Sequence, residues 1–146
     1  MVHALEQIHS LLKSGGRLID FHPNGKLVEL IYSLDGQEQL IGYVQETDDY
    51  IEYHQADEAV ETAVAAGLFG LDETGEFEFR THADSFDELK AFLDENWSDA
   101  VITEDVIASA RRLEKEHGKR KVFLREWGKI NFLMVKNHGL AKSTVK

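Results

Sequence analysis

The sequence predicts an α/β domain, or an α+β domain when the chain is isolated, with about four helices, a small mixed sheet and an inserted β-hairpin. Three observations lead to this prediction. Residues 2–23 have the pattern of a helix, a two-glycine turn and a strand. The dipeptide Asp35-Gly36, a strong hairpin signal, separates two apolar stretches. Residues 76–82 alternate charged and apolar side chains, which indicates a half-buried strand, and helix signals follow them.

The first helix is expected over residues 2–13, with one apolar face formed by Leu5, Ile8, Leu11 and Leu12. Gly15 and Gly16 end it, because glycine enters left-handed geometry at little cost. Residues 17–21 then form a short strand. Its Leu18-Ile19 pair is apolar on both faces, which predicts a parallel strand covered on each side.

The later elements follow from periodicity and capping signals. Ser85 and Glu88 form a capping box that begins one helix, and Thr103 is expected to cap another. The expected order is strands 26–33 and 39–45, an acidic connector 48–54, a helix 55–66, a strand 76–82, a helix from Ser85, a helix 103–116, and strands 121–126 and 129–136 that are broken near Gly128. No linker divides the chain, so we expect one domain over residues 1–137 and a flexible basic tail over 138–146.

Composition excludes several classes of protein. The 146 residues contain no cysteine, which excludes disulfides and thiolate chemistry and is compatible with the cytoplasmic location that we predict. No apolar run approaches the ~20 residues that span a bilayer, so no membrane partner is expected. The net charge of −11 is uneven, with 5 Lys/Arg and 24 Asp/Glu in residues 1–110 and 11 Lys/Arg and 3 Asp/Glu in residues 111–146. We therefore expect no nucleic-acid partner, because the acidic body repels phosphate.

The basic segment allows two interpretations. It contains six cations, Arg111, Arg112, Lys115, Lys119, Arg120 and Lys121. They could contact phosphate. The interpretation that we prefer is a solvated helix end that complements the helix dipole.

The stretch LLKSGGRLID resembles the turn that precedes the fifth strand of class I S-adenosylmethionine-dependent methyltransferases. Leu12, Lys13, Gly15 and Gly16 match that turn, and Ser14 stands where the family has proline. The later order of elements, with an antiparallel strand over 76–82 and a last strand ending at Phe132–Lys136, is also similar to the C-terminal half of that family. The resemblance implies an incomplete methyltransferase-like three-layer sandwich.

The same resemblance implies that the cofactor-binding half is missing. The chain contains no G-x-G-x-G loop, and no strand precedes its first helix. Ligands of open α/β sheets bind at the topological switch point, and this chain begins beyond that point. We expect no cofactor to be bound by this chain alone, with S-adenosylmethionine bound only if the missing half is supplied. The protein would then be a truncated or split methyltransferase that is inactive alone, and the alternative is a non-enzymatic binding or regulatory module.

The weak candidates for site residues are Asp20, His22 and Asn24, in the turn after the first strand. Strand ends collect active-site groups in this architecture, and these side chains suit acid–base or polar recognition. The alternative is a solvated turn with an Asn-Gly tip. A group of His54, Asp57 and Glu58 lies on one helix turn, but it more often marks a helix start, so no metal site is predicted.

The strand over residues 17–21 predicts an unpaired apolar edge if earlier strands are missing. Such an edge promotes aggregation unless it is covered. A second copy of the chain, a complementary protein or the hairpin over residues 26–45 could cover it. Symmetric self-association is the commonest solution, so we predict a homodimer.

Overall fold

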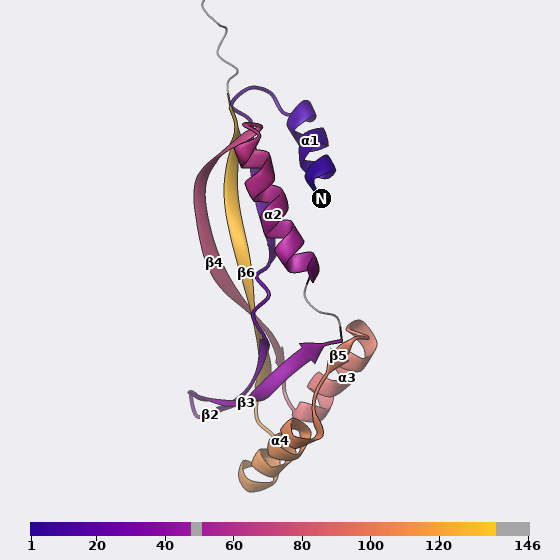
Figure 1. The fold of residues 1–146 in the computed structure, drawn as a ribbon. Helices are drawn as coiled ribbons and strands as arrows, with labels where there is room; N and C mark the ends of the chain where they lie inside the picture. The colour runs from indigo at the N-terminus through magenta and orange to yellow at the C-terminus, as the bar shows by residue number, and fades with distance from the viewer. Residues whose placement is uncertain (48–50, 137–146) are drawn as a thin grey trace, which may run out of the picture. The chain divides into compact units, whose positions relative to one another are not determined.

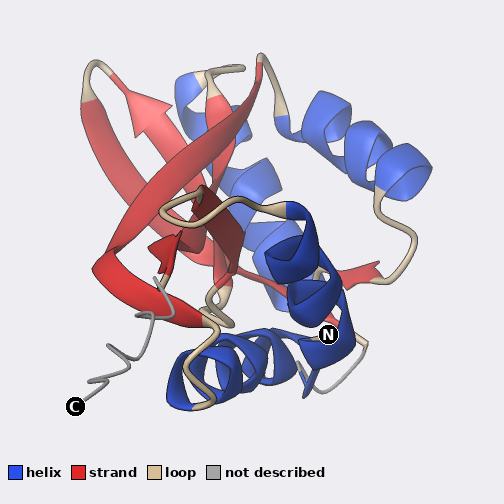
Figure 2. Ribbon diagram, turned by 90° about the horizontal axis from the view of Figure 1, so that it is seen from above, coloured by secondary structure: helices blue, strands red, loops and turns tan. Residues whose placement is uncertain are grey.

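The computed structural model describes residues 1–47 and 51–136. The described residues form four helices and six strands, which confirms the expected α/β class and helix number (Figure 1, Figure 2). In chain order the elements are α1 (Val2–Leu11), β1 (Arg17–Pro23), β2 (Val28–Leu34), β3 (Gln37–Glu46), α2 (Ile51–Ala65), β4 (Phe69–Ala83), α3 (Phe86–Asn96), β5 (Ala100–Val101), α4 (Glu104–His117) and β6 (Val122–Val135). The expected tail over 138–146 lies outside the described residues.

The six strands form one antiparallel sheet, so the prediction of a mixed sheet was wrong. The strand order is β1-β6-β2-β3-β5, and β4 also pairs with β6. Strand β2 pairs antiparallel with β3 and with β6, and β3 pairs antiparallel with β5. Antiparallel strands can be joined by tight turns, whereas parallel strands need long crossovers. Strand β1 lies at one end of this order, as expected for an edge strand.

The prediction that β1 is a parallel strand buried on both faces was wrong. Along Arg17–Pro23 exposed and half-buried residues alternate. Ile19 is 57% exposed and Phe21 is 71% exposed, whereas Leu18 packs against a core cluster. Period-two alternation marks a strand with one covered face and one open face, which antiparallel sheets permit.

The chain divides into two compact units. Unit 1 contains Met1–His22, Glu52–Glu76 and Lys129–Lys146, and unit 2 contains Pro23–Ile51 and Phe77–Gly128. The division falls within β4 and within β6. Each unit has its own hydrophobic core.

Unit 1 consists of a sheet that is covered by α1 and α2. Its core is formed by Leu5, Ala59, Val60, Ala63, Phe69, Leu133 and Val135. A two-glycine turn leads from α1 to β1: Gly15 has φ +72°, and the main chains of Gly16 and Val135 are hydrogen-bonded at 2.9 Å. The turn therefore positions β1 beside the last residues of β6.

Unit 2 begins with the hairpin that Asp35-Gly36 predicted. Asp35 and Gly36 have φ values of 50° and 82°, as a tight two-residue hairpin turn requires. Helix α3 begins with the predicted cap, because Ser85 accepts a hydrogen bond from the main chain of Glu88 at 3.2 Å. The core is formed by Leu30, Tyr32, Val44, Ala83, Phe86, Leu89, Leu93, Ala110, Leu113, Val122 and Leu124.

Two glycines of unit 2 are sites of close packing. A Cβ atom at Gly42 would overlap the side chain of Val106, so α4 approaches β3 through the space left by the glycine. A Cβ atom at Gly128 would overlap the ring of Phe77 in the same way. The predicted strand break near Gly128 was wrong, because β6 is continuous and the glycine accommodates an aromatic ring.

The boundaries of two other elements also differ from the predictions. Strand β4 begins at Phe69 instead of residue 76, and α2 already includes residues 51–54 of the expected connector. Residues 48–50 of that connector lie outside the described residues. In the part of the chain that is described, no helix combines the length and the apolar character that crossing a bilayer needs.

Candidate functional site

Strand β1 carries different chemistry on its two faces within unit 1. Successive side chains of a strand point to opposite faces. Asp20 and His22 lie on one face, where His22 bonds a residue of α2, and Ile19 and Phe21 lie on the other. The structure therefore places two of the three predicted site residues next to each other, with an apolar surface behind them.

His22 joins two carboxylates that come from different elements. Its Nδ1 lies 3.1 Å from Asp20 Oδ2, and its Nε2 lies 3.2 Å from Asp57 Oδ1 on α2. The His22 side chain is only 10% exposed. The histidine thus ties β1 to α2 through both of its ring nitrogens.

Two residues of β6 and one of β4 extend this contact into a polar network. Lys129 Nζ donates to Asp57 Oδ1 at 2.6 Å, and Asn131 Nδ2 donates to Asp20 Oδ2 at 2.9 Å. Thr74 Oγ1 donates to Asn131 Oδ1 at 2.9 Å. Asn131 is 2% exposed, and buried amides are stable only when their hydrogen bonds are made. We call these six residues the His22 network: Asp20, His22, Asp57, Thr74, Lys129 and Asn131.

The network favours the charged form of Asp57. Burial alone would raise the pKa of this carboxyl, but hydrogen bonds from Lys129 and His22, together with their charges, outweigh it and lower the pKa. Both nitrogens of His22 already face carboxylates, so neither is positioned to take a proton from a substrate. The hydrogen bonds of His22 therefore hold β1 and α2 together.

Asn24, the third predicted site residue, has a turn role. Its Oδ1 accepts a hydrogen bond from the main-chain N–H of Lys26 at 3.1 Å. Its own main-chain N–H donates to the carbonyl of Trp127 at 3.2 Å. These bonds match the alternative interpretation of a turn with an Asn-Gly tip.

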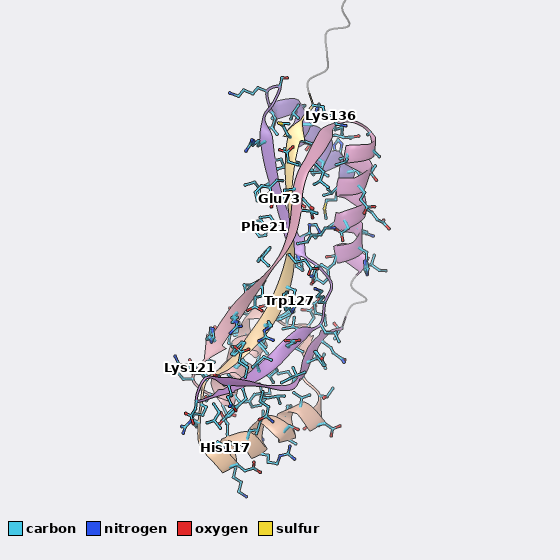
Figure 3. The ribbon with its side chains drawn as sticks, turned by 90° about the vertical axis from the view of Figure 1, so that its left-hand side faces the viewer. Phe21, Glu73, His117, Lys121, Trp127 and Lys136 are labelled. Carbon is cyan, nitrogen blue, oxygen red and sulfur yellow. The ribbon has the colours of Figure 1, made fainter. Side chains whose placement is uncertain are left out.

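The opposite face of unit 1 is apolar and accessible. On β1 this face carries Ile19 and Phe21, which are 57% and 71% exposed. On β6 the residues that alternate with the core positions are half-buried, namely Ile130, Phe132 and Met134. Figure 3 shows the Phe21 side chain standing out from the strands, and it labels Glu73 of β4 on the same unit. We call the five apolar residues Ile19, Phe21, Ile130, Phe132 and Met134 the open face.

The other groups that the sequence suggested do not form a site in the described residues. No cluster of three or more His, Asp or Glu side chains in residues 1–47 and 51–136 is placed to hold a metal ion. Asp57 turns to His22 and Lys129 instead of forming a site with His54. The six cations of the basic run are all exposed at the end of α4 and in the turn that follows it.

Comparison with known proteins gives no match, either among protein-family models or among curated sequences. The function must therefore be argued from the geometry. Sequence reasoning missed Thr74, Lys129 and Asn131, which lie far from β1 along the chain. A signal was present only for Asp20 and His22, whose spacing of two residues puts both on one face of a strand.

Proposed function

We propose that this protein is a non-enzymatic binding module that self-associates through strand β1. The observation that carries the proposal is the exposure of Ile19 and Phe21, at 57% and 71%, on a strand at the end of the sheet order. An edge strand presents main-chain donors and acceptors to which another strand can pair, and apolar side chains beside it favour burial.

Charge favours unit 1 over unit 2 as the place where a second copy makes contact. Among the described residues unit 1 carries 4 Lys/Arg and 9 Asp/Glu, whereas unit 2 carries 10 Lys/Arg and 16 Asp/Glu. Two copies of an acidic protein therefore repel each other least where unit 1 faces unit 1. A two-fold antiparallel pair also uses each β1 edge once, so assembly stops at a dimer.

The sequence of β1 favours one register for this pair. If the two-fold axis passes at Phe21, the two Phe21 rings lie side by side and Asp20 of each copy lies opposite His22 of the other. If the axis passes at Asp20, two carboxylates lie opposite each other. Opposite charges and aromatic pairs stabilise cross-strand positions, and like charges destabilise them. We therefore propose the pair centred on Phe21.

Disulfide trapping tests this register directly, because the chain contains no cysteine. A disulfide needs Cα atoms about 4.4–6.8 Å apart. Phe21→Cys should give a covalent dimer on mild oxidation. The matched control is Leu11→Cys, since Leu11 is 85% exposed on α1 and lies outside the proposed contact. Equal trapping at both positions would show random collision and would overturn the register.

Sedimentation velocity tests the dimer itself. The wild-type chain should sediment as a dimer, and Phe21→Glu should sediment as a monomer, because two buried carboxylates would face each other. Leu11→Glu should stay dimeric. A wild-type chain that is monomeric under dilute conditions would overturn the proposal. A monomer that associates only with another protein would favour a complementary chain instead.

The second candidate is a methyltransferase-like half that is inactive alone and that would form part of a three-layer sandwich. A helix, a glycine turn with Gly15 at φ +72° and a strand do follow one another at residues 2–23. Against it, the buried parallel strand that the pair Leu18-Ile19 predicted is instead antiparallel with one open face.

Calorimetric titration with S-adenosylmethionine tests this candidate. We expect no heat from this chain alone, in keeping with a missing cofactor half. Heat that fits one site per chain would show a cofactor pocket and would reject the non-enzymatic proposal. A cytoplasmic location remains a prediction that rests on the lack of cysteine.

A further inference from the structure

The two carboxylate contacts of His22 can coexist only when its ring carries two protons. A neutral imidazole has one N–H donor and one lone pair, whereas the protonated ring donates from both nitrogens. Carboxylate oxygens lie at hydrogen-bond distance from both nitrogens, at 3.1 Å and 3.2 Å. If the ring loses a proton, one of the two nitrogens presents a lone pair to a carboxylate.

The charges around His22 balance only in the protonated state. The groups that face it are Asp20 on β1, Asp57 on α2, and Lys129 and Asn131 on β6, with Thr74 of β4 bonded to Asn131. Two carboxylates are matched by Lys129 and a protonated His22. Loss of the histidine proton leaves two carboxylates with one cation. Imidazole is the side chain that ordinarily changes charge between about pH 5 and 8.

We propose that protonation of His22 regulates self-association by holding β1 against α2. This inference rests on the proposed function, because Phe21, the centre of the proposed pair, lies between Asp20 and His22. When both bonds are made, the main chain of β1 is fixed in an extended form on the body of unit 1. A pre-organised edge loses less conformational freedom on pairing, so dimerisation is stronger at low pH and weaker at high pH.

Equilibrium sedimentation at about pH 6 and about pH 8.5 tests the regulation, across the range in which histidine titrates. The dissociation constant of the wild-type dimer should rise about tenfold between the two, which corresponds to the loss of one charge-assisted hydrogen bond. His22→Gln, which carries no positive charge at either pH, should bind weakly at both. The matched control is His3→Gln, because the His3 side chain is 81% exposed on α1.

The general repulsion between acidic chains also changes with pH, and it changes alike in the wild type and both variants. The regulation is therefore tested by comparing the pH dependence of the dimer dissociation constant in His22→Gln with that in the wild type. Unaltered pH dependence in His22→Gln would overturn the regulation while leaving the dimer intact. A wild type that is monomeric at both values would overturn the dimer and its regulation together.

Nitrogen NMR of the His22 ring gives a readout that does not depend on association. The proposal requires both ring nitrogens to carry a proton in the dimer at about pH 6, since only then does each donate to a carboxylate. A neutral ring with a single tautomer at that pH would overturn the proposal, whatever the oligomeric state.

Discussion

The outer sheet faces of the two units are covered in opposite ways. In unit 2, Phe123 is only 2% exposed, and it lies outside the core cluster that contains its neighbours Val122 and Leu124. The guanidinium groups of Arg80 and Arg125 lie 4.7 Å and 5.8 Å from its ring. In unit 1, the outward Phe21 is 71% exposed. Phe123 is thus buried beneath two arginines in unit 2, whereas Phe21 of the edge strand is exposed in unit 1.

An ionic layer completes the cover of unit 2. Arg125 bonds Glu29 at 2.8 Å and also bonds Glu38, and Arg80 bonds Glu38 at 2.6 Å and Glu78 at 2.7 Å. The hydrogen bond from Arg80 is the main cause that lowers the pKa of Glu38. In unit 1 the ionic groups instead lie on the helix side, in the His22 network. One sheet face is therefore covered by its own charged side chains, whereas the other leaves Phe21 exposed.

Truncating the two aromatic residues should give the largest difference between the faces. Phe123→Ala should lower the free energy of unfolding by about 3–5 kcal/mol, as expected for a large buried ring. Phe21→Ala should change it by less than about 0.5 kcal/mol in the dissociated chain, because an exposed side chain loses little on truncation. Urea unfolding at low protein concentration measures both. Similar losses would break the contrast between sealed and open faces.

Removing the buried amide of the His22 network should give the next largest effect. Asn131→Ala leaves Asp20 and Thr74 without a partner that both use, and it should cost about 2 kcal/mol. Asn96→Ala is the control, because the amide of Asn96 bonds a carbonyl of its own exposed helix end. Urea unfolding of both variants measures the difference. Equal values would mean that the buried network contributes no more than a surface amide.

Opening the ionic cover of unit 2 should have a smaller effect. Arg125→Ala uncovers part of Phe123 and removes the ion pairs of Arg125 with Glu29, Glu38 and Glu78. Arg80 still pairs with Glu38 and Glu78 in this variant. We expect a loss of about 1 kcal/mol, since partly exposed ion pairs are weak singly and stronger in networks. Arg17→Ala, on the exposed β1 position, serves as the control. Salt should shrink the difference, and a loss that is insensitive to salt would show that packing dominates.

The smallest predicted effect concerns Glu126, whose pKa is raised by burial and is only partly offset by a hydrogen bond from Thr81. The folded state therefore holds a proton that the unfolded state releases. Its stability falls as pH rises from the ordinary carboxyl pKa, 4.5, to the raised folded pKa, and stays lower above it. Glu126→Gln should thus stabilise the protein by about 0.5 kcal/mol near pH 7. Thermal unfolding at about pH 4 and about pH 7 checks this, and a gain that is equal at both would contradict it.

Local signals in the sequence predicted those parts of the fold that local geometry decides. Asp35-Gly36 predicted the hairpin because few other dipeptides adopt positive φ at both positions, and Ser85 predicted a helix start through its own hydrogen bond. The first half of β4 was missed because Asp72, Glu73 and Thr74 do not alternate with apolar residues. Gly128 led to the wrong prediction of a strand break, because the glycine leaves space for Phe77, a residue distant in the sequence.

The sequence likewise predicted only the part of the candidate site that lies within one strand. Asp20 and His22 belong to one strand, so their proximity follows from the strand period alone. Asp57, Lys129 and Asn131 join them from α2 and β6, and only tertiary packing brings these elements together. The direction of β1 could not be derived either, because an apolar pair such as Leu18-Ile19 suits both a buried parallel strand and an edge strand with an open face.

The absence of a side chain at Gly42 sets the thickness of a layer. The branched side chain of Val106 enters the space above this glycine, so α4 rests on the main chain of β3 itself. A single methyl group placed there would act as a wedge between helix and sheet. The core side chains between α4 and the sheet therefore have the sizes that fit one distance between helix and sheet. A larger residue at position 42 would increase this distance, and the core side chains would have to change in size to fill the space.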